Sequence, residues 1–286
     1  MRLATFRSGE AAHVGVRRGE DLVDLAIAAP ELPASLIGIL GLADGVERAR
    51  AAAAHAGSEA RRPMASVSLL PPIPEPGKII CLGLNYPDHA AESALEKPAA
   101  PNIFLRTAQS LVAHGAPIVR PAVSSALDFE GELAVVIGRN CRNTPREQAL
   151  AAVAGYSVFN DGSVRDFQMR ASQWTLGKNF DATGGFGPEL VTADELPEGA
   201  AGLKLQTRLN GEAMQVADTA EMIFGVAETI AYVSQAMTLV PGDVLVMGTP
   251  AGVGFARRPP VWMKPGDVCE VEIERIGVLR NPIAAG

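Results

Sequence analysis

The hydrophobic pattern of the chain is mostly that of short strands. Positions 127–138 end in an apolar run, Leu-Ala-Val-Val-Ile, which stops at a glycine and predicts a strand buried in a core. Residues 268–274 alternate apolar and acidic side chains, so we expect a strand with one face in water. Residues 244–247 form another short apolar run, and both of these last segments follow a Pro-Gly-Asp turn. The pattern favours a mainly β fold.

A few segments have helical character instead. Residues 33–60 are rich in Ala, Leu and Ile, which predicts helix. Residues 144–154 begin with Thr-Pro-Arg-Glu, a typical helix start, and the helix is expected to stop at Gly155. A third helix is expected from Asp218 to just before Pro241, because apolar residues recur near helical spacing at Met222, Val226, Ile230, Val233 and Met237.

A proline-rich stretch divides the chain. Residues 71–77 contain four prolines and a glycine, which predicts a stiff, extended linker. Before it, residues 1–70 combine two strand-like runs with the helical segment, so we expect a small N-terminal α+β domain. After it, residues 78–286 form the larger domain, mostly strands with a few helices. The expected fold class is therefore α+β, mainly β.

Composition narrows the class of protein. The 286 residues are 48% hydrophobic and 20% charged, a balance typical of globular proteins. The net charge is -7 and no basic stripe stands out, which argues against a nucleic-acid partner. Three widely spaced cysteines without a Cys-x-x-Cys pair favour a reducing compartment, the cytoplasm, over a disulfide framework. No apolar run approaches the ~20 residues that span a bilayer, and the first residues lack a signal-peptide core, so no membrane partner is expected.

Two acidic residues interrupt the apolar character of the strand predicted at 127–138. Glu130 and Glu132 are two positions apart, so their side chains point to one face. Two buried carboxylates repel each other and lose hydration, so a cation is needed to balance them. Asp161 ends another strand-like run and adds a third oxygen ligand, a set that favours Mg²⁺, Mn²⁺ or Ca²⁺ over zinc. A solvated strand face has equal support from the pattern alone, and Asp128 is either a further carboxylate of the site or a charge at its rim.

Lys178 lies in a mostly apolar stretch, residues 174–180. A lysine there offsets the negative charge of three carboxylates or orients an anionic substrate oxygen. On its own, however, such a residue is more often a surface lysine whose stem packs on a neighbour such as Trp174.

Two further segments carry groups suited to chemistry. His89 and Glu92 share a face if their segment is helical, and a His–Glu pair can activate water, although a capped surface helix explains the spacing equally well. Residues 248–254 are small and follow an apolar strand, so backbone can approach a ligand there, and Thr249 adds a hydroxyl. A plain turn is the alternative, and the lysine of a phosphate-binding loop is absent.

Taken together, five segments resemble, in the same order, the motifs of the fumarylacetoacetate hydrolase family. They are Cys81-Leu82-Gly83-Leu84-Asn85-Tyr86 with His89 and Glu92, Asp128-Phe129-Glu130-Gly131-Glu132-Leu133, Asn160-Asp161-Gly162-Ser163-Val164-Arg165-Asp166-Phe167-Gln168, Leu176-Gly177-Lys178 and Gly248-Thr249-Pro250. Each motif is weak alone, whereas five in order are specific, and together they cover nearly all of the larger domain.

The resemblance implies that residues 78–286 form a catalytic domain, a mainly β roll around a metal site, usually in a homodimer. It also implies that Glu130, Glu132 and Asp161 bind Mg²⁺ or Mn²⁺, and that Lys178 supports both metal and substrate. Residues 1–70 would then be the small variable N-terminal domain of the family.

The resemblance further implies that His89 and Glu92 belong to a mobile loop that closes over the site. By the same resemblance, Arg106, Gln168 and Thr249 are substrate-contacting positions. Two residues depart from the family pattern: Arg106 stands where many members carry a lysine, and Gly162 where many carry a larger, often aromatic residue. These departures bear on the identity of the substrate more than on the metal site.

The resulting hypothesis is a metal-dependent hydrolase of an acylpyruvate-type β-diketo acid. The cation chelates the 2-oxo acid and stabilises the enolate that leaves when the C–C bond breaks, Lys178 stabilises developing negative charge, and Glu92, paired with His89, draws a proton from the attacking water. Two alternatives use the same site: oxaloacetate decarboxylation, or isomerisation or hydration of a 2-hydroxydienoate. A third is a non-catalytic protein that binds a 2-oxo acid.

Overall fold

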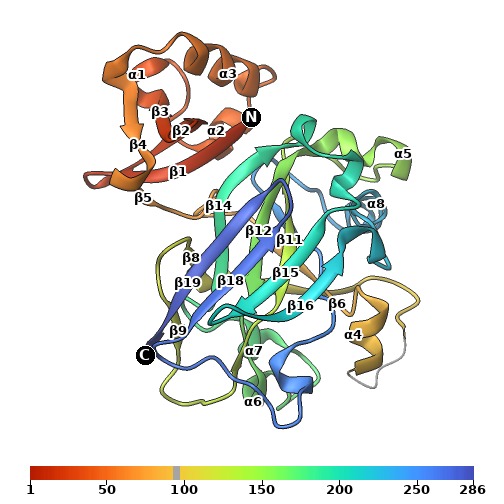
Figure 1. Cartoon of the computed structure of the whole chain (residues 1–286). Helices are drawn as coiled ribbons and strands as arrows, with labels where there is room; N and C mark the ends of the chain where they lie inside the picture. The colour runs from red at the N-terminus through yellow and green to blue at the C-terminus, as the bar shows by residue number, and fades with distance from the viewer. Residues whose placement is uncertain (93–96) are drawn as a thin grey trace.

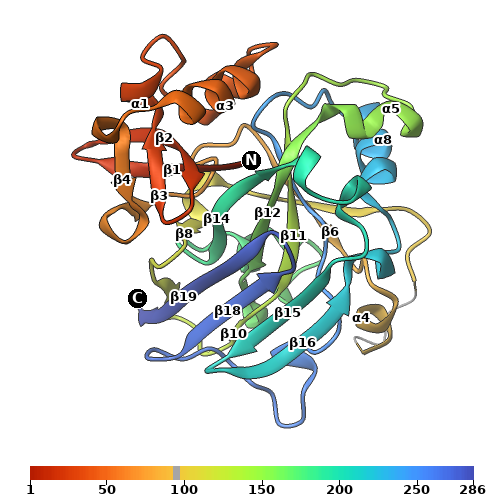
Figure 2. The ribbon, with the colours of Figure 1, turned by 45° about the horizontal axis from the view of Figure 1, so that its top comes forward.

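The computed structural model describes residues 1–92 and 97–286, and one large sheet runs through it (Figures 1 and 2). Each neighbouring pair in the following order is hydrogen-bonded: β4 (Arg61–Pro63), β3 (Asp21–Asp24), β2 (Ala11–Arg18), β1 (Arg2–Ser8), β14 (Gly184–Thr192), β12 (Val153–Asp161), β11 (Gly131–Ile137), β17 (Val244–Val246), β6 (Ile79–Gly83) and β7 (Asn102–Arg106). Two short strands join it from the side, β5 (Ser68–Leu69) on β1 and β8 (Leu111–Ala113) on β14.

A second sheet packs on the C-terminal part of the first and lies in front of β11 and β12 in Figure 1. Its strands, in order, are β16 (Glu212–Asp218), β15 (Lys204–Leu209), β18 (Val268–Ile273), β19 (Gly277–Ala285) and β9 (Ile118–Arg120). A separate two-stranded ladder joins β10 (Leu127–Asp128) to β13 (Ser163–Val164). The expected α+β, mainly β fold is therefore confirmed.

Strand β11 shows how the hydrophobic residues are divided between the two faces of the large sheet. Leu133, Val135 and Ile137 belong to the core cluster that contains residues of the second sheet and of helix α8 (Val226–Ala236). Ala134 and Val136 belong to the opposite cluster, together with residues of the N-terminal unit. Side chains alternate between the two faces of a strand, so each face of β11 packs in one of the two clusters. Because both faces are covered, the run is apolar throughout.

The N-terminal residues join the large sheet through β1. Leu3 pairs with Leu190 of β14, and Leu3 and Phe186 lie in one core cluster. Helices α1 (Leu25–Ala28), α2 (Leu36–Leu40) and α3 (Gly45–His55) cover this end of the sheet (Figures 1 and 2). The proline-rich segment begins buried, and Thr5 donates a hydrogen bond to the carbonyl of Pro72. Residues 1–70 thus share a sheet and a core with the rest of the chain, and the division at 71–77 stays a prediction.

Three predicted helices differ from those observed. Residues 33–60 form two helices, α2 and α3, because a Cβ at Gly45 would overlap the carbonyl of Ile39 and the chain turns between them. Helix α5 (Arg146–Ala149) passes into a single 3-10 turn that ends at Ala152. Gly155 lies in β12 rather than at a helix end, since the close approach of β14 leaves no room for a side chain there.

The third helix starts later than predicted. Asp218 and Glu221 do form the expected capping box, but it caps only a 3-10 turn, Thr219–Glu221, and α8 begins at Val226 with Gly225 as its N-cap. The strands predicted at 244–247 and 268–274 correspond to β17 and β18. Among the described residues, no helix is both long and apolar enough to cross a membrane.

Candidate metal and catalytic site

Three carboxylates converge where β11 and β12 meet the short β10–β13 ladder. The strand predicted at 127–138 is interrupted at Phe129 and Glu130, yet Glu130 and Glu132 still share a face, and Asp161 ends the neighbouring strand β12. Oxygen atoms of these three side chains lie within 4.8 Å of one another, and all three residues are buried. Gly131 faces the second sheet, where a Cβ would overlap the hydroxyl of Thr207, so the spacing of the two glutamates around a glycine follows from packing.

Lys178 provides the positive charge closest to this cluster. It is fully buried at the end of α7 (Thr175–Lys178), and its Nζ lies 2.6 Å from Glu130 Oε2 and 2.5 Å from Asp161 Oδ2. The alternative of a surface lysine is therefore wrong. Burial works against the charged form, but Asp161 and Glu130 outweigh it and raise the pKa of Lys178.

Arg106 lies behind Asp161 and outside the cavity. Its guanidinium donates to Asp161 Oδ1 at 2.6 Å and to the Gly162 carbonyl at 3.1 Å, and it also bonds the hydroxyls of Ser110 and Thr183. The side chain has no exposed surface. The expectation that Arg106 contacts substrate is therefore wrong, because its donors are committed to the protein; it fixes one oxygen of a predicted metal ligand instead.

Arg165, which is not among the predicted site residues, is the second cation of the cavity. It begins helix α6 (Arg165–Gln168), and its guanidinium lies 2.6 Å from Glu130 Oε1 and 2.8 Å from Asp128 Oδ2. Asp128 is fully buried and also accepts the backbone N–H groups of Gly254 and Phe255. It is therefore neither a rim charge nor one of the three clustered carboxylates, but the residue that orients Arg165.

The buried charges of the site do not balance, and the excess negative charge indicates whether a metal cation suits it. Four carboxylates face three permanent cations, and these groups are Asp128, Glu130, Glu132, Asp161, Arg106, Arg165 and Lys178. Glu132 has no ion-pair partner among the described residues, and its pKa is raised well above the usual range by burial and by Asp161 and Glu130. By contrast, Arg165 and Lys178 outweigh burial at Glu130 and hold its pKa below the usual range. An all-oxygen set with one uncompensated carboxylate suits Mg²⁺ or Mn²⁺.

The predicted His89–Glu92 pair forms on helix α4 (Pro87–Glu92). His89 Nδ1 lies 2.8 Å from Glu92 Oε1, and Glu92 Oε2 accepts the backbone N–H of Gly252 at 2.9 Å. His89 lines the cavity, whereas Glu92 lies behind it with both oxygens engaged. The histidine is therefore the member of the pair that faces a substrate.

Gln168 and Thr249 also line the cavity. Gln168 Oε1 accepts a hydrogen bond from Arg165, which leaves its amide N–H groups available. The Thr249 hydroxyl donates to the Gly131 carbonyl and accepts from Gln215, a buried residue of β16 that is not among the predicted site residues. Gln215 also accepts the N–H of Gly131, so it ties the 248–254 segment to the backbone between the two glutamates.

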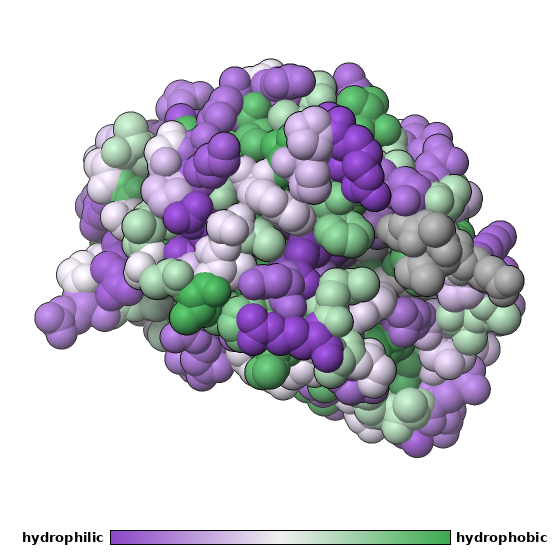
Figure 3. Space-filling model, turned by 90° about the horizontal axis from the view of Figure 1, so that it is seen from below, coloured by the Kyte–Doolittle hydropathy of each residue, from purple (hydrophilic) through white to green (hydrophobic). Residues whose placement is uncertain are grey.

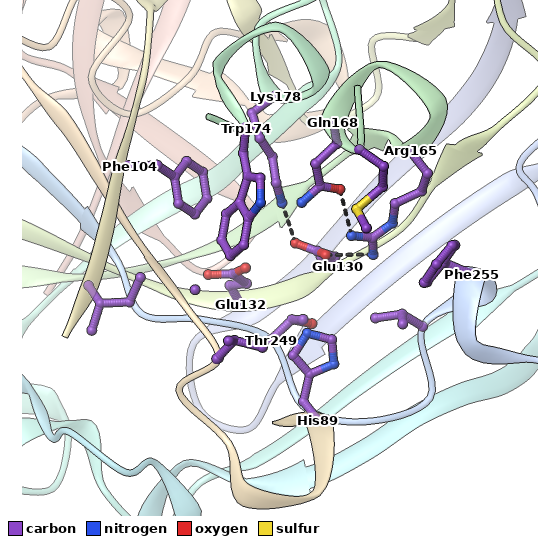
Figure 4. Close-up of a pocket in the computed structure, with 15 residues that line it drawn as sticks. His89, Phe104, Glu130, Glu132, Arg165, Gln168, Trp174, Lys178, Thr249 and Phe255 are labelled. Atoms are coloured by element: carbon purple, nitrogen blue, oxygen red, sulfur yellow. Dashed lines mark hydrogen bonds and ion pairs between the residues drawn. The ribbon is translucent and has the colours of Figure 1, made fainter. Parts of the chain in front are cut away.

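The cavity has a volume of about 310 Å³, and its lining includes residues of α4, α6 and α7. On the face seen from below the view of Figure 1, hydrophobic side chains lie scattered between hydrophilic ones (Figure 3). Inside, Glu130 is central, with Trp174 and Phe104 on one side and Arg165 and Phe255 on the other (Figure 4). The described lining residues are Leu82, Gly83, Leu84, His89, Phe104, Glu130, Glu132, Arg165, Gln168, Met169, Trp174, Lys178, Thr249, Val253 and Phe255.

Comparison with known proteins places this geometry in a family. The family model described as fumarylacetoacetate (FAA) hydrolase C-terminal matches residues 78–284. The curated relatives include the mitochondrial oxaloacetate tautomerase Fahd2a of Rattus norvegicus, 40% identical over 297 residues, which cover 99% of this chain and 91% of that protein. Human oxaloacetate tautomerase FAHD2A, also named as mitochondrial, is 39% identical over 289 residues, covering 99% of this chain and 91% of its own.

Solved structures give the same result over the full length. Fumarylacetoacetate hydrolase from Exiguobacterium antarcticum has a TM-score of 0.85 at 35% identity, with 100% of both chains covered. Maleylpyruvate hydrolase from Sphingobium sp. SYK-6, solved with manganese(II) and pyruvate, has a TM-score of 0.82 at 31% identity, also with 100% of both chains covered. The chain therefore belongs to the fumarylacetoacetate hydrolase family.

Proposed function

We propose that this protein is a metal-dependent hydrolase that cleaves the C–C bond of an acylpyruvate-type β-diketo acid. The observation that carries the proposal is that Glu130 and Glu132 of the three-carboxylate cluster line the same cavity as His89 of the His–Glu pair. Glu130, Glu132 and Asp161 would hold Mg²⁺ or Mn²⁺. When bound, the cation supplies a Lewis acid that stabilises the enolate of a 2-oxo acid. A relative of known structure binds manganese(II) and pyruvate, which supports this part.

The protein groups divide the remaining work. His89 takes a proton from water while Glu92 holds the opposite ring nitrogen, so that hydroxide attacks the distal carbonyl carbon of the substrate. The bond between that carbon and the neighbouring methylene then breaks, its electron pair passes into the pyruvate enolate, and the enolate is protonated at carbon. This assignment revises the expectation that Glu92 itself meets the water, because both Glu92 oxygens already have partners.

Lys178 and Arg165 support the anionic groups. The Lys178 ammonium holds Glu130 and Asp161 in position and offsets charge that develops on the substrate. Arg165 and the free amide of Gln168 face the cavity and would bind the substrate carboxylate. In this proposal Thr249 lines the substrate site, and its hydroxyl chiefly positions the Glu130–Glu132 backbone.

A second candidate reaction is the keto–enol interconversion of oxaloacetate. It is favoured by the relatives that are 38–40% identical over 99% of this chain and are named oxaloacetate tautomerases. The same His–Glu pair could move a proton between carbon and solvent without any attack by water. A homodimeric state and a cytoplasmic location remain predictions.

Product analysis tests the proposal. The purified full chain, with Mg²⁺ or Mn²⁺, is given acetylpyruvate in ¹⁸O-labelled water, and we expect one pyruvate and one acetate per turnover, with the label in the acetate. Removal of divalent cations by a chelator and dialysis should abolish the reaction, and added Mg²⁺ should restore it. Enol–keto exchange of oxaloacetate without cleavage of any acylpyruvate would instead favour the tautomerase, and full activity without a divalent cation would defeat both.

A further inference from the structure

The cavity is asymmetric about Glu130. Its Oε1 pairs with Arg165, whose guanidinium carbon lies 5.8 Å from the ring centre of Phe255. Its Oε2 pairs with Lys178, whose Nζ lies 5.0 Å from the ring centre of Phe104. The line of contacts continues from Phe104 to Trp174, whose rings meet edge to face at 5.5 Å. One end of the cavity therefore carries a cation that faces the open space, and the other ends in an aromatic wall (Figure 4).

The aromatic end is built by a close fit between two strands and a loop. A Cβ at Gly83 would overlap the Trp174 ring, so the ring occupies the space that a side chain on β6 would need. Leu82 and Leu84 line the cavity on either side of Gly83, and Phe104 projects from the neighbouring strand β7. The polar group nearest this contact is the neutral amide of Asn102, on the exposed side.

Among the described residues that line the cavity, no lysine or arginine at this end is free of a carboxylate partner. Lys178 is enclosed between Glu130 and Asp161, and Arg165 lies at the other end with Asp128, Glu130 and Gln168 as partners. A carboxylate buried against Trp174 and Phe104 would lose its hydration without gaining a partner, which is costly.

The net charge of the site favours the same class of substrate. Four buried carboxylates, the ionised Glu92 that pairs with a neutral His89, and three permanent cations leave two negative charges, which a bound divalent cation would balance. The single carboxylate of a 2-oxo acid then adds one negative charge, for which Arg165 lies at one end of the cavity. A second carboxylate would add another negative charge to an enclosed site.

We propose that Trp174, Phe104, Gly83 and the two flanking leucines form a subsite for an apolar acyl group, so that the preferred substrates are acylpyruvates ending in an aromatic or branched hydrocarbon rather than in a second carboxylate. This inference rests on the proposed function for its orientation: the carboxylate of the substrate lies toward Arg165, and the acyl group toward Trp174. Oxaloacetate would leave the subsite empty.

A binding experiment tests the subsite apart from turnover. The full chain with Mn²⁺ is titrated with 2-oxo-4-phenylbutanoate and with 2-oxoadipate, which differ chiefly in the group at the far end. We expect the phenyl compound to bind at least about tenfold more tightly, the magnitude expected when one aromatic group is buried. The Trp262→Phe variant leaves Trp174 as the single tryptophan of the chain, and we expect its fluorescence to change with the phenyl compound. Equal or tighter binding of 2-oxoadipate would overturn the inference.

Variants at Trp174 and Gly83 test whether these residues produce the preference for the phenyl ligand. Trp174→Ala and Gly83→Ala should each remove most of the ratio between the two ligands, the first by deleting the wall and the second by displacing the ring. Leu176→Ala is the matched control, since this apolar residue lies two positions after Trp174, on α7, but is 69% exposed and does not line the cavity. An unchanged ratio in both wall variants would overturn the assignment to Trp174.

Turnover separates this inference from the proposed function. Benzoylpyruvate should have a kcat/KM at least about tenfold above that of fumarylpyruvate, and the ratio should fall in Trp174→Ala. Cleavage with a preference for fumarylpyruvate would contradict the apolar subsite and leave the hydrolase intact. Preferential binding of the phenyl ligand without cleavage of any acylpyruvate would contradict the hydrolase and leave the subsite intact. If neither 2-oxo acid binds with Mg²⁺ or Mn²⁺, both are wrong.

Discussion

The carboxylate cluster and the His89–Glu92 pair both contribute side chains to one cavity but are held in different ways. Every carboxylate oxygen of Glu130 and Asp161 has a cationic partner within 2.6 Å, and these residues lie at the ends of strands in the main sheet. Glu92 lies at the end of a six-residue helix, and within the described part of the chain its hydrogen bond to the rest of the protein comes from the backbone N–H of Gly252. The metal half of the site is part of the folded core, whereas the proton-transfer half is docked against it. We therefore expect mutations to separate stability from catalysis.

The largest effect is expected for Lys178→Met. The substitution keeps the length of the side chain but leaves Glu130 and Asp161 with less compensation in a buried site, at a cost of about 3–5 kcal/mol. Thermal unfolding of the metal-free protein should show a Tm lower by about 10 °C. Lys204→Met, at an exposed position in β15, is the control and should leave the Tm unchanged. A normal Tm for Lys178→Met would mean that the cluster does not depend on this cation.

Glu92→Gln should affect catalysis without affecting stability. The amide keeps the size of the side chain but cannot orient and stabilise a protonated His89, so kcat should fall by about 10²- to 10⁴-fold. The Tm and the affinity for Mn²⁺ should stay near their wild-type values, because no clustered carboxylate contacts Glu92. Asp88→Asn, which changes the charge of an exposed residue on the same helix, should leave kcat unchanged. If Glu92→Gln also weakens metal binding, the two halves of the site are not separate.

Arg106→Lys tests how strongly the core orients a metal ligand. A lysine cannot bond Asp161, Ser110 and Thr183 together, so Asp161 should lose part of its fixed orientation. We expect Mn²⁺ to bind about 10- to 100-fold more weakly by isothermal titration calorimetry. The matched control is Arg208→Lys, since Arg208 also pairs with two carboxylates, Glu270 and Glu272, but lies on the second sheet. This variant should bind Mn²⁺ as the wild type does. Unchanged affinity would show that Arg106 contributes packing alone.

The smallest effect is expected for Glu132→Gln in the metal-free protein. Because the folded chain raises the pKa of Glu132, it binds this proton more tightly than the unfolded chain does. This group therefore lowers stability as the pH rises from about 4.3 through the raised pKa. Glu132→Gln removes that loss, so its Tm should exceed the wild-type Tm by a few degrees at pH 8, and by less at pH 5. A Tm difference that does not grow with pH would contradict the raised pKa of Glu132. Added Mn²⁺ should raise the Tm of the wild type only, because Glu132 is one of the proposed metal ligands.

Much of the site could be predicted because it depends on local periodicity. The two-residue repeat of a strand puts Glu130 and Glu132 on one face, and that relation survives the interruption of the strand at Phe129. Asp161 is predicted from its position at the end of a strand-like run, and the pairing of β12 with β11 is what brings it to the two glutamates. The spacing of His89 and Glu92 predicts that they share a helix face, but it supports a capped surface helix equally well, and the structure brings the two side chains into contact.

The remaining features depend on tertiary pairing that sequence spacing does not reveal. Arg165 reaches Asp128 only because Leu127 pairs with Val164 across the β10–β13 ladder. Gln215 reaches the site from the second sheet. Arg106 shares a face of β7 with Phe104, so the sequence pattern predicts the face of the strand from which its side chain projects. The pattern does not predict that the guanidinium is buried among Ser110, Asp161 and Thr183 rather than in the cavity.

The pairing of β1 with β14 has a consequence for the order of folding. Strand β1 can form a hairpin with β2 early, since Leu3 pairs with Val16, but its partner on the other side, Leu190, is synthesised much later. Contacts between residues so far apart in sequence form slowly, and an edge strand that waits for its partner is open to pairing with another chain. We therefore expect the nascent chain to be most prone to aggregation in the interval before β14 leaves the ribosome, and expression at lower temperature to favour correct closure of the sheet.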